Sequence, residues 1–276
     1  MSDLDGSDAY SPVEIARRVE AVGEAKARMA ALPLALLGVL AGAFIGLGAM
    51  LFVLVKSDPT LGFAVSALLG GLVFSLGLFM VVVAGAELFT GNNLIAMAWA
   101  DGRVSTAQLL RNWVIVCLAN FVGAAGLALL VWASGHASLN GGAIGQKVLQ
   151  IALAKQELPF FTALLRGVLC NVLVCMAVWM AMGGRSLVDK AVAVVFPVMA
   201  FVAAGFEHSI ANMYLMPLAM LLQHGGLTGG APVTWGGMLG NLMPVILGNV
   251  LGGAVLVAGV YHVIYKRHRC LSAPAR

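Results

Sequence analysis

Long apolar stretches without a charged residue constrain the fold of this chain more than any other feature. A helix needs about 20 apolar residues to cross the ~30 Å hydrocarbon core of a bilayer. Uncharged runs of this order occupy residues 32–55, 61–86, 112–135, 167–184 and 191–206. Only 10% of the residues are charged and 61% are hydrophobic, whereas charged residues make up about 25% of a soluble domain. The chain is therefore predicted to be an all-α integral membrane protein.

A final run, residues 209–265, contains no Asp, Glu, Lys or Arg. Its middle, near residues 223–235, is rich in glycine and contains Pro232, which is typical of a loop. We therefore predict a helix end, a loop and a last span over residues 241–265, which makes six transmembrane helices in all.

The basic residues predict how these spans are oriented. If both termini are cytoplasmic, only Lys56, Lys147, Lys155 and Arg166 of the 16 lysines and arginines face outward. This bias follows the positive-inside rule. It also accounts for the net charge of +4, so the charge gives no reason to expect a nucleic-acid partner. The N-terminus is acidic and polar, which argues against a cleaved signal peptide.

An amphipathic helix is expected before the first span. Ser11 and Glu14 have the spacing of a capping box around Pro12, and the helix is expected to run to about Arg28. We interpret it as an anchor at the cytoplasmic membrane surface, with a movable plug over a pore mouth as the alternative. The predicted divisions are an N-terminal helix region (residues 1–30), a transmembrane channel domain (31–266) and a cytoplasmic tail (267–276).

Two segments interrupt the apolar pattern with the same polar sequence. Residues 85–92 and 205–212 each contain Gly-x-Glu followed by an asparagine. Ionisable groups at bilayer depth cost on the order of 3 kcal/mol, and unwound backbone is tolerated there only where protein or water lines it. The second and fifth helices are therefore predicted to be broken, with the loops lining a pathway.

His208 lies in the second break and is the histidine farthest from any predicted membrane boundary. Its charge can change near neutral pH, so it can meet an anion as imidazolium or pass it a proton. Desolvation favours the neutral ring and a nearby negative charge favours the cation, so both states stay open. Thr90, in the first break, can donate and accept hydrogen bonds, which suits binding an anion or orienting a histidine.

A second pair of matching segments extends the repeat. Residues 118–123 of the third span resemble residues 247–252 of the sixth. Spans one to three and four to six then form two halves, and halves with an odd number of spans insert in opposite orientations. Inverted repeats with broken helices at matching positions predict a transport site.

Other classes fit the residues less well. Two asparagines stand where an aquaporin-type channel for neutral solutes would have Asn-Pro-Ala turns, but Asn93 and Met213 follow them. An intramembrane enzyme built on Glu207 and His208 would lack a second metal ligand or a nucleophile with a base. The four cysteines are not spaced for zinc or redox chemistry, so no metal or cofactor is expected.

The two motifs, residues 85–92 and 205–213, resemble the formate/nitrite transporter family, and the resemblance extends over nearly the whole chain. It implies a homopentamer in the bacterial inner membrane, surrounded by lipid. Each protomer would have an aquaporin-like fold and its own pore for small monovalent anions.

The same resemblance assigns roles to individual residues. His208 matches the central pore histidine, Thr90 its partner, and Asn171 an asparagine near that histidine. The apolar constriction residues are Phe74, Leu78, Phe201 and Val174. The lysine of the external vestibule is Lys155, and the supports of the helix breaks are Glu87, Asn92, Glu207 and Asn212.

Formate is the first substrate that the resemblance implies, with nitrite or hydrosulfide as alternatives. The N-terminal helix and residues 184–190 resemble formate channels, whereas residues 153–155 and the pair Glu87 and Gly91 look as much like nitrite channels. His208 would either hand the anion a proton, so that a neutral acid crosses, or stay charged and offset the anion. Proton coupling at low pH is the version we favour.

Overall fold

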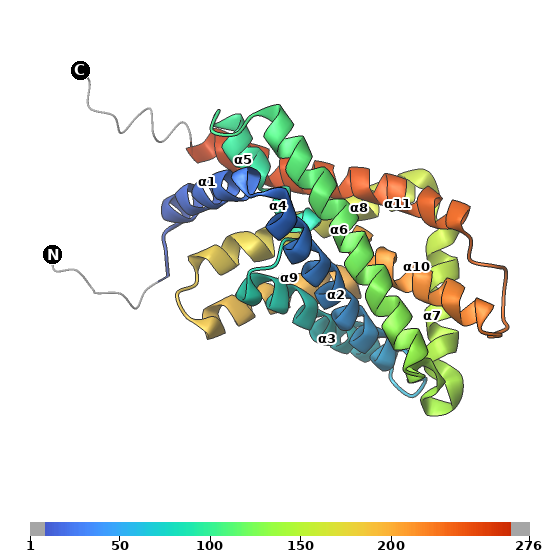
Figure 1. The fold of residues 1–276 in the computed structure, drawn as a ribbon. Helices are drawn as coiled ribbons and strands as arrows, with labels where there is room; N and C mark the ends of the chain where they lie inside the picture. The colour runs from blue at the N-terminus through green and yellow to red at the C-terminus, as the bar shows by residue number, and fades with distance from the viewer. Residues whose placement is uncertain (1–8, 266–276) are drawn as a thin grey trace, which may run out of the picture.

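Membrane-length helices make up most of the structure, a computed structural model that describes residues 9–265 (Figure 1). No strand occurs within that range. The helices are α1 (Pro12–Arg28), α2 (Ala31–Lys56), α3 (Phe63–Ala84), α4 (Phe89–Asn92), α5 (Ile95–Ala100), α6 (Thr106–Ala133), α7 (Ala143–Gln156), α8 (Phe160–Gly183), α9 (Leu187–Ala203), α10 (Ser209–His224) and α11 (Trp235–Val250). Short 3₁₀ turns, η1 (His136–Ser138) and η2 (Asn140–Gly142), precede α7, and a π-helical segment, η3 (Leu251–Gly259), continues α11.

Among the described residues, five helices are long and apolar enough to cross a membrane: α2, α3, α6, α8 and the continuous helix Trp235–Tyr265. Three of them begin before the predicted spans, at Thr106, Phe160 and Trp235 rather than at residues 112, 167 and 241. Two of these early starts were missed because Arg111 and Arg166 end the uncharged runs. The third was missed because Gly236 and Gly237 resemble loop residues, although Thr234 caps the helix there.

The N-terminal helix α1 begins with the expected capping box. Ser11 N donates to Glu14 Oε2 (2.8 Å), Glu14 N donates to Ser11 Oγ (3.4 Å), and Pro12 is the first helical residue. Hydrogen bonds from Ser11 lower the pKa of the Glu14 carboxyl. Glu20, although charged, is fully buried and pairs with Arg103 (3.4 Å). It is buried because α1 packs against α5, where Gly23 faces Ala98.

Glycines allow α2 and α6 to approach closely. A Cβ added at Gly42 would overlap the Asn120 carbonyl, and one added at Gly123 would overlap the Val39 carbonyl. Small residues at helix contacts are typical of membrane proteins, in which van der Waals packing replaces a hydrophobic driving force.

Replacing Gly42 with alanine should therefore lower the thermal unfolding temperature of the detergent-solubilised protein. The added methyl forces the helices apart, and such overpacking costs about 1–3 kcal/mol. Gly126→Ala is the matched control, because a Cβ at Gly126 meets nothing within 4 Å. Equal unfolding temperatures for the two variants would contradict the close approach.

Candidate functional site

Two loops interrupt helical structure at matching places. The loop after α3 begins at Gly85 (φ 77°) and ends where α4 starts at Phe89, and the loop after α9 contains Gly205 (φ 71°) and ends at Ser209. Glycine adopts this left-handed conformation without the steric cost that a Cβ brings. After the first loop, helix resumes as the four-residue α4 and then as α5, which Leu94 precedes as its N-cap residue.

Two buried asparagines satisfy the backbone that these loops expose. Asn120 donates to Gly38 O (2.7 Å) and Glu87 O (2.9 Å), and accepts from Phe89 N (2.9 Å). In the same way, Asn249 donates to the carbonyls of Gly167 (2.8 Å) and Glu207 (3.1 Å) and accepts from Ser209 N (3.1 Å). These asparagines lie in the matching segments 118–123 and 247–252, but the sequence analysis assigned them no site.

The first loop carries a partly buried ion pair. Lys26 of α1 contacts Glu87 Oε1 (3.0 Å) and donates to Asn92 Oδ1 (3.0 Å). Asn92 Nδ2 donates to Glu87 Oε2 (2.7 Å) and to Asn112 Oδ1 (3.0 Å), and Asn112 donates to the Lys26 carbonyl (3.1 Å). Glu87 and Asn92 thus hold a lysine in place, while Asn120 satisfies the backbone.

The second loop repeats most of this arrangement, with one difference: Lys155 binds both oxygens of Glu207, and Asn212 Oδ1 has no hydrogen-bond partner among the described residues. Lys155 of α7 donates to both carboxylate oxygens of Glu207 (2.9 Å each). Asn212 Nδ2 donates to Glu207 Oε2 (2.7 Å) and to Asn241 Oδ1 (2.7 Å), and Asn241 donates to the Lys155 carbonyl (2.9 Å).

Sequence reasoning found Lys155 but missed Lys26. The sequence contained a hint of this match, because Lys26 precedes Gly38 by as many residues as Lys155 precedes Gly167. The carbonyls of these two glycines accept hydrogen bonds from Asn120 and Asn249, respectively. The helices that carry the two lysines, α1 and α7, lie toward opposite ends of the molecule (Figure 1).

His208 caps α10 and pairs with Thr90. Its Nδ1 accepts from Ala211 N (3.2 Å), and its Nε2 lies 3.1 Å from Thr90 Oγ1. A nitrogen that accepts a hydrogen bond carries no hydrogen, so the neutral ring has its proton on Nε2 and donates it to Thr90. The Thr90 hydroxyl hydrogen is then directed to another acceptor.

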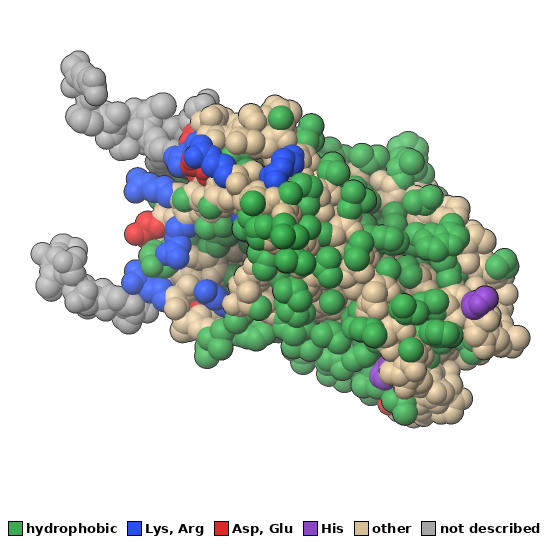
Figure 2. Space-filling view, in the orientation of Figure 1, with side chains coloured by type: hydrophobic (Ala, Val, Ile, Leu, Met, Phe, Trp, Pro, Cys, Tyr) green, Lys and Arg blue, Asp and Glu red, His purple; other side chains and the backbone are tan. Residues whose placement is uncertain are grey.

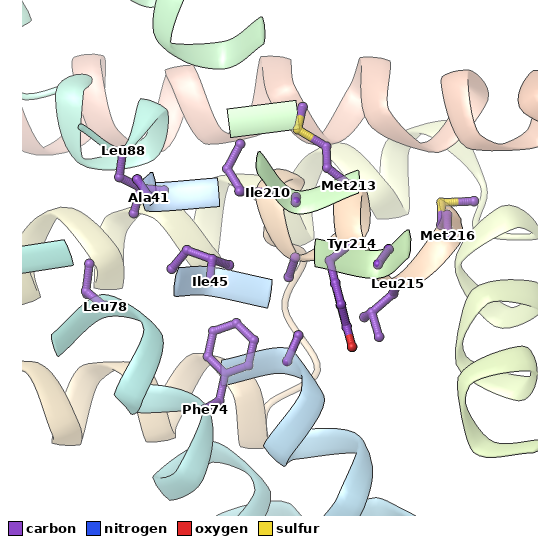
Figure 3. Packing of buried hydrophobic residues seen from close by; sticks show 14 of the residues in the cluster. Ala41, Ile45, Phe74, Leu78, Leu88, Ile210, Met213, Tyr214, Leu215 and Met216 are labelled. Carbon is purple, nitrogen blue, oxygen red and sulfur yellow. The ribbon is translucent and has the colours of Figure 1, made fainter. Parts of the chain in front are cut away.

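Aromatic side chains surround this ring. Phe201 stacks on His208, with ring centroids 5.9 Å apart, and Phe74 meets it edge-on at 6.5 Å. Leu78 lies one turn beyond Phe74 on α3, and both side chains face Ile45 of α2 (Figure 3). An anion gains no compensating charge from these apolar groups, so they form a barrier to a bare anion.

Two cavities approach this group from opposite sides. The first, about 250 Å³, is lined by residues that include Lys26, Glu87, Leu78 and Leu88. A cavity of about 240 Å³ on the other side contains Lys155, Glu207, Phe74, Phe201 and His208. Each cavity therefore has a lysine–glutamate pair in its wall. Leu78 lines the first cavity and Phe74, one helical turn away, lines the second.

Two predicted residues have other surroundings. Val174 is buried in the core, and Val178, one turn further along α8, lines the first cavity. Asn171 donates to Thr90 O (3.2 Å) and Asn93 Oδ1 (2.7 Å), so it holds the backbone of Thr90.

The comparisons with known proteins agree with one another. A family model described as Formate/nitrite transporter matches residues 13–263. The formate channel FocA of Escherichia coli (strain K12) is 40% identical over 273 residues, covering 94% of this chain and 96% of that protein. FocA of Haemophilus influenzae is 37% identical, covering 95% of this chain and 97% of its own. A solved pentameric formate channel with formate bound has a TM-score of 0.80 at 37% identity, covering 86% of this chain and 98% of that one.

Proposed function

Because this chain belongs to the formate/nitrite transporter family, we propose that it is a channel for small monovalent anions with formate as its main substrate. One observation carries the proposal: two cavities with lysine-bearing walls converge on the apolar group around Thr90 and His208. The name of the relative FocA and the formate bound in the similar pentameric channel support formate as the substrate. Nothing in the contacts favours nitrite, hydrosulfide or a neutral solute.

The proposed architecture has six membrane crossings. The broken second crossing consists of α3, α4 and α5, and the broken fifth crossing consists of α9 and α10. The matched contacts of Lys26 and Lys155 support two inverted halves and an aquaporin-like protomer. Such repeats place a transport site at the interface between the halves. The pentameric state of the similar solved channel supports a homopentamer.

We place α1 and its cavity on the cytoplasmic side of a bacterial inner membrane. Lysine and arginine side chains gather at the α1 end of the molecule, beyond a broad hydrophobic surface (Figure 2). This distribution follows the positive-inside rule. In this orientation residues 1–30 and the tail, residues 267–276, flank the channel domain in the cytoplasm. Residues 1–8 and the whole of that tail lie outside the described residues. Lys155 then lies in the outer vestibule.

Passage begins with attraction of formate by Lys155 into the outer cavity. Beyond it, the Phe74 and Phe201 rings exclude water, and the Thr90 hydroxyl and His208 Nε2–H are the donors that meet the carboxylate. Charging His208 adds a hydrogen at Nδ1 and breaks the bond from Ala211 N, a cap interaction worth about 0.5–2 kcal/mol. In the proposed transfer the imidazolium Nε2–H bond breaks, a formate O–H bond forms, and neutral imidazole remains with its hydrogen on Nδ1.

Uptake by proteoliposomes tests the substrate. Purified protein is reconstituted, and the initial rates for labelled formate, nitrite, hydrosulfide and glycerol are compared with those of protein-free liposomes at the same pH. We expect the largest rate above background for formate and none for glycerol. A rate for glycerol that exceeds the formate rate would favour the neutral-solute channel instead.

Lys155→Met should lower the rate of formate uptake by about tenfold or more, in line with the effect of charge on association rates. The variant leaves the Glu207 carboxylate in the outer cavity, where it repels the anion. Lys155→Met combined with Glu207→Gln removes that repulsion and should recover part of the rate. Lys147→Met is the control, because Lys147 lies on the same helix and contacts exposed Gln150. Equal rates for Lys155→Met and Lys147→Met would contradict the proposed attraction.

A further inference from the structure

Three side chains with metal-binding atoms meet on the α1 side of the molecule, although they are far apart in the sequence. They are Glu20 of α1, Asp101 in the turn after α5, and His262 near the end of the last helix. One ligand atom from each lies within 4.8 Å of the other two. We infer that Glu20, Asp101 and His262 form a binding site for a divalent transition-metal ion, a function separate from the proposed anion pathway.

The burial of the histidine points to a ligand. His262 is 8% exposed, and its Nδ1 has no hydrogen-bond partner among the described residues. A buried ring nitrogen without a partner is unfavourable, since it has lost its hydrogen bonds to water. A metal ion bound by this nitrogen removes the deficit, and the two nearby carboxylates supply the negative charge that a cation requires.

Arg103 shares its charge among the carboxylates of this region. It pairs with Asp101 (2.8 Å), Glu20 (3.4 Å) and, more distantly, Glu24 (4.0 Å). Glu24 also pairs with Arg28. Each carboxylate offers two oxygens, so an ion can bind without displacing every contact of Arg103.

The donor set indicates which ions fit. Two carboxylates and one imidazole suit Mn²⁺, Fe²⁺, Co²⁺ or Zn²⁺, whereas Ca²⁺ and Mg²⁺ prefer oxygen ligands alone. Three protein ligands leave a further coordination position for water. A bound ion would join α1 to the turn after α5 and to the last helix. It would thereby fix the helix whose Lys26 lines the first cavity.

The sequence analysis expected no metal because the cysteines are not spaced for one, and Glu20, Asp101 and His262 form no motif either. They meet through the packing of α1 on α5 and of α5 against the last helix, where Val19, Met97 and Val257 share one hydrophobic cluster. Neither the spacing nor the residue types of single segments contain that information.

Titration with Co²⁺ tests the site directly. The full-length, tag-free protein in lipid nanodiscs is titrated, and the visible absorption of bound Co²⁺ is recorded against protein-free nanodiscs. We expect one Co²⁺ per protomer, displaced by Zn²⁺. His262→Gln should weaken binding at least about tenfold, because even changes to groups behind the ligands cost about that much.

Matched variants keep this test decisive. His224→Gln changes an exposed histidine elsewhere and should bind Co²⁺ like the wild type. The double change His268→Gln and Cys270→Ser, in residues outside the described range, should also retain binding. Glu20→Gln and Asp101→Asn should each weaken binding even if His262→Gln proves poorly folded by size-exclusion chromatography.

Arg103→Gln separates a metal site from an ion-pair network. Removal of this cation should raise the affinity for Co²⁺ by about tenfold or more, since one charge no longer competes for the carboxylates. The proposal is overturned if no Co²⁺ binds above the nanodisc background. It is equally overturned if His262→Gln, Glu20→Gln and Asp101→Asn all bind with the wild-type affinity. Formate uptake measured without added metal tests the proposed channel function independently.

Discussion

His208→Asn should abolish the pH dependence of formate uptake and reduce its rate at low pH by about 100-fold or more, the scale on which positioned acids and bases act. Asparagine is chosen because it is a good helix N-cap, so its side chain can still accept from Ala211 N and keep α10 in place. What it lacks is a ring nitrogen that can give up a proton and regain it. Initial rates of labelled formate uptake are measured in proteoliposomes across a pH series.

Changes at Thr90 refine this result. Thr90→Ser keeps the hydroxyl that lies 3.1 Å from His208 Nε2 and should preserve the pH profile. Thr90→Val removes the hydroxyl at nearly constant volume and should slow uptake at every pH. His224→Gln, a change in an exposed histidine, serves as the control. An unchanged pH profile in His208→Asn would rule out a proton role for this histidine.

Asn249→Leu should have the largest effect on stability. The change leaves Gly167 O, Glu207 O and Ser209 N without their partner in a buried region. Each unsatisfied buried group costs about 1–3 kcal/mol, so the total is comparable to the ~5–15 kcal/mol that stabilises a typical domain. We expect little monodisperse protein after solubilisation, measured by size-exclusion chromatography and thermal unfolding.

The matched position in the other loop gives an internal check. Asn120→Leu breaks the same three types of contact, to Gly38 O, Glu87 O and Phe89 N, and should be equally damaging. Gln150→Leu makes a similar amide-to-leucine change on the exposed face of α7 and should leave the protein folded. Normal yield and unfolding temperature for Asn249→Leu would show that the loops do not depend on this residue.

Membership of the formate/nitrite transporter family was predictable from two short motifs, and it is confirmed by the family match and the relatives. The all-helical, membrane-spanning character was predictable from hydrophobicity alone, because apolar length decides whether a helix can cross a bilayer. Helix starts were less predictable. Thr106 and Phe160 precede the uncharged runs, because the first turns of these helices tolerate polar residues that the bilayer core does not.

Parts of the site depend on contacts between distant segments and were not predictable from local sequence. Lys26 was assigned to a surface helix, yet it occupies the same network position as Lys155. A charged residue in an amphipathic helix is usually solvated, but Glu20 pairs with Arg103 and is fully buried. The roles of His208 and Thr90 remain predictions, although the contact between the two side chains makes them specific.

The most direct test of the channel proposal records formate uptake, lumen pH and membrane potential together in proteoliposomes. A formate gradient is applied at low external pH, and protein-free liposomes give the background diffusion of formic acid. The account predicts saturable formate uptake well above that background, with acidification of the lumen and no sustained electrical current. Uptake equal to the background would contradict transport through this protein, and uptake carried by a steady anion current would contradict proton transfer at His208.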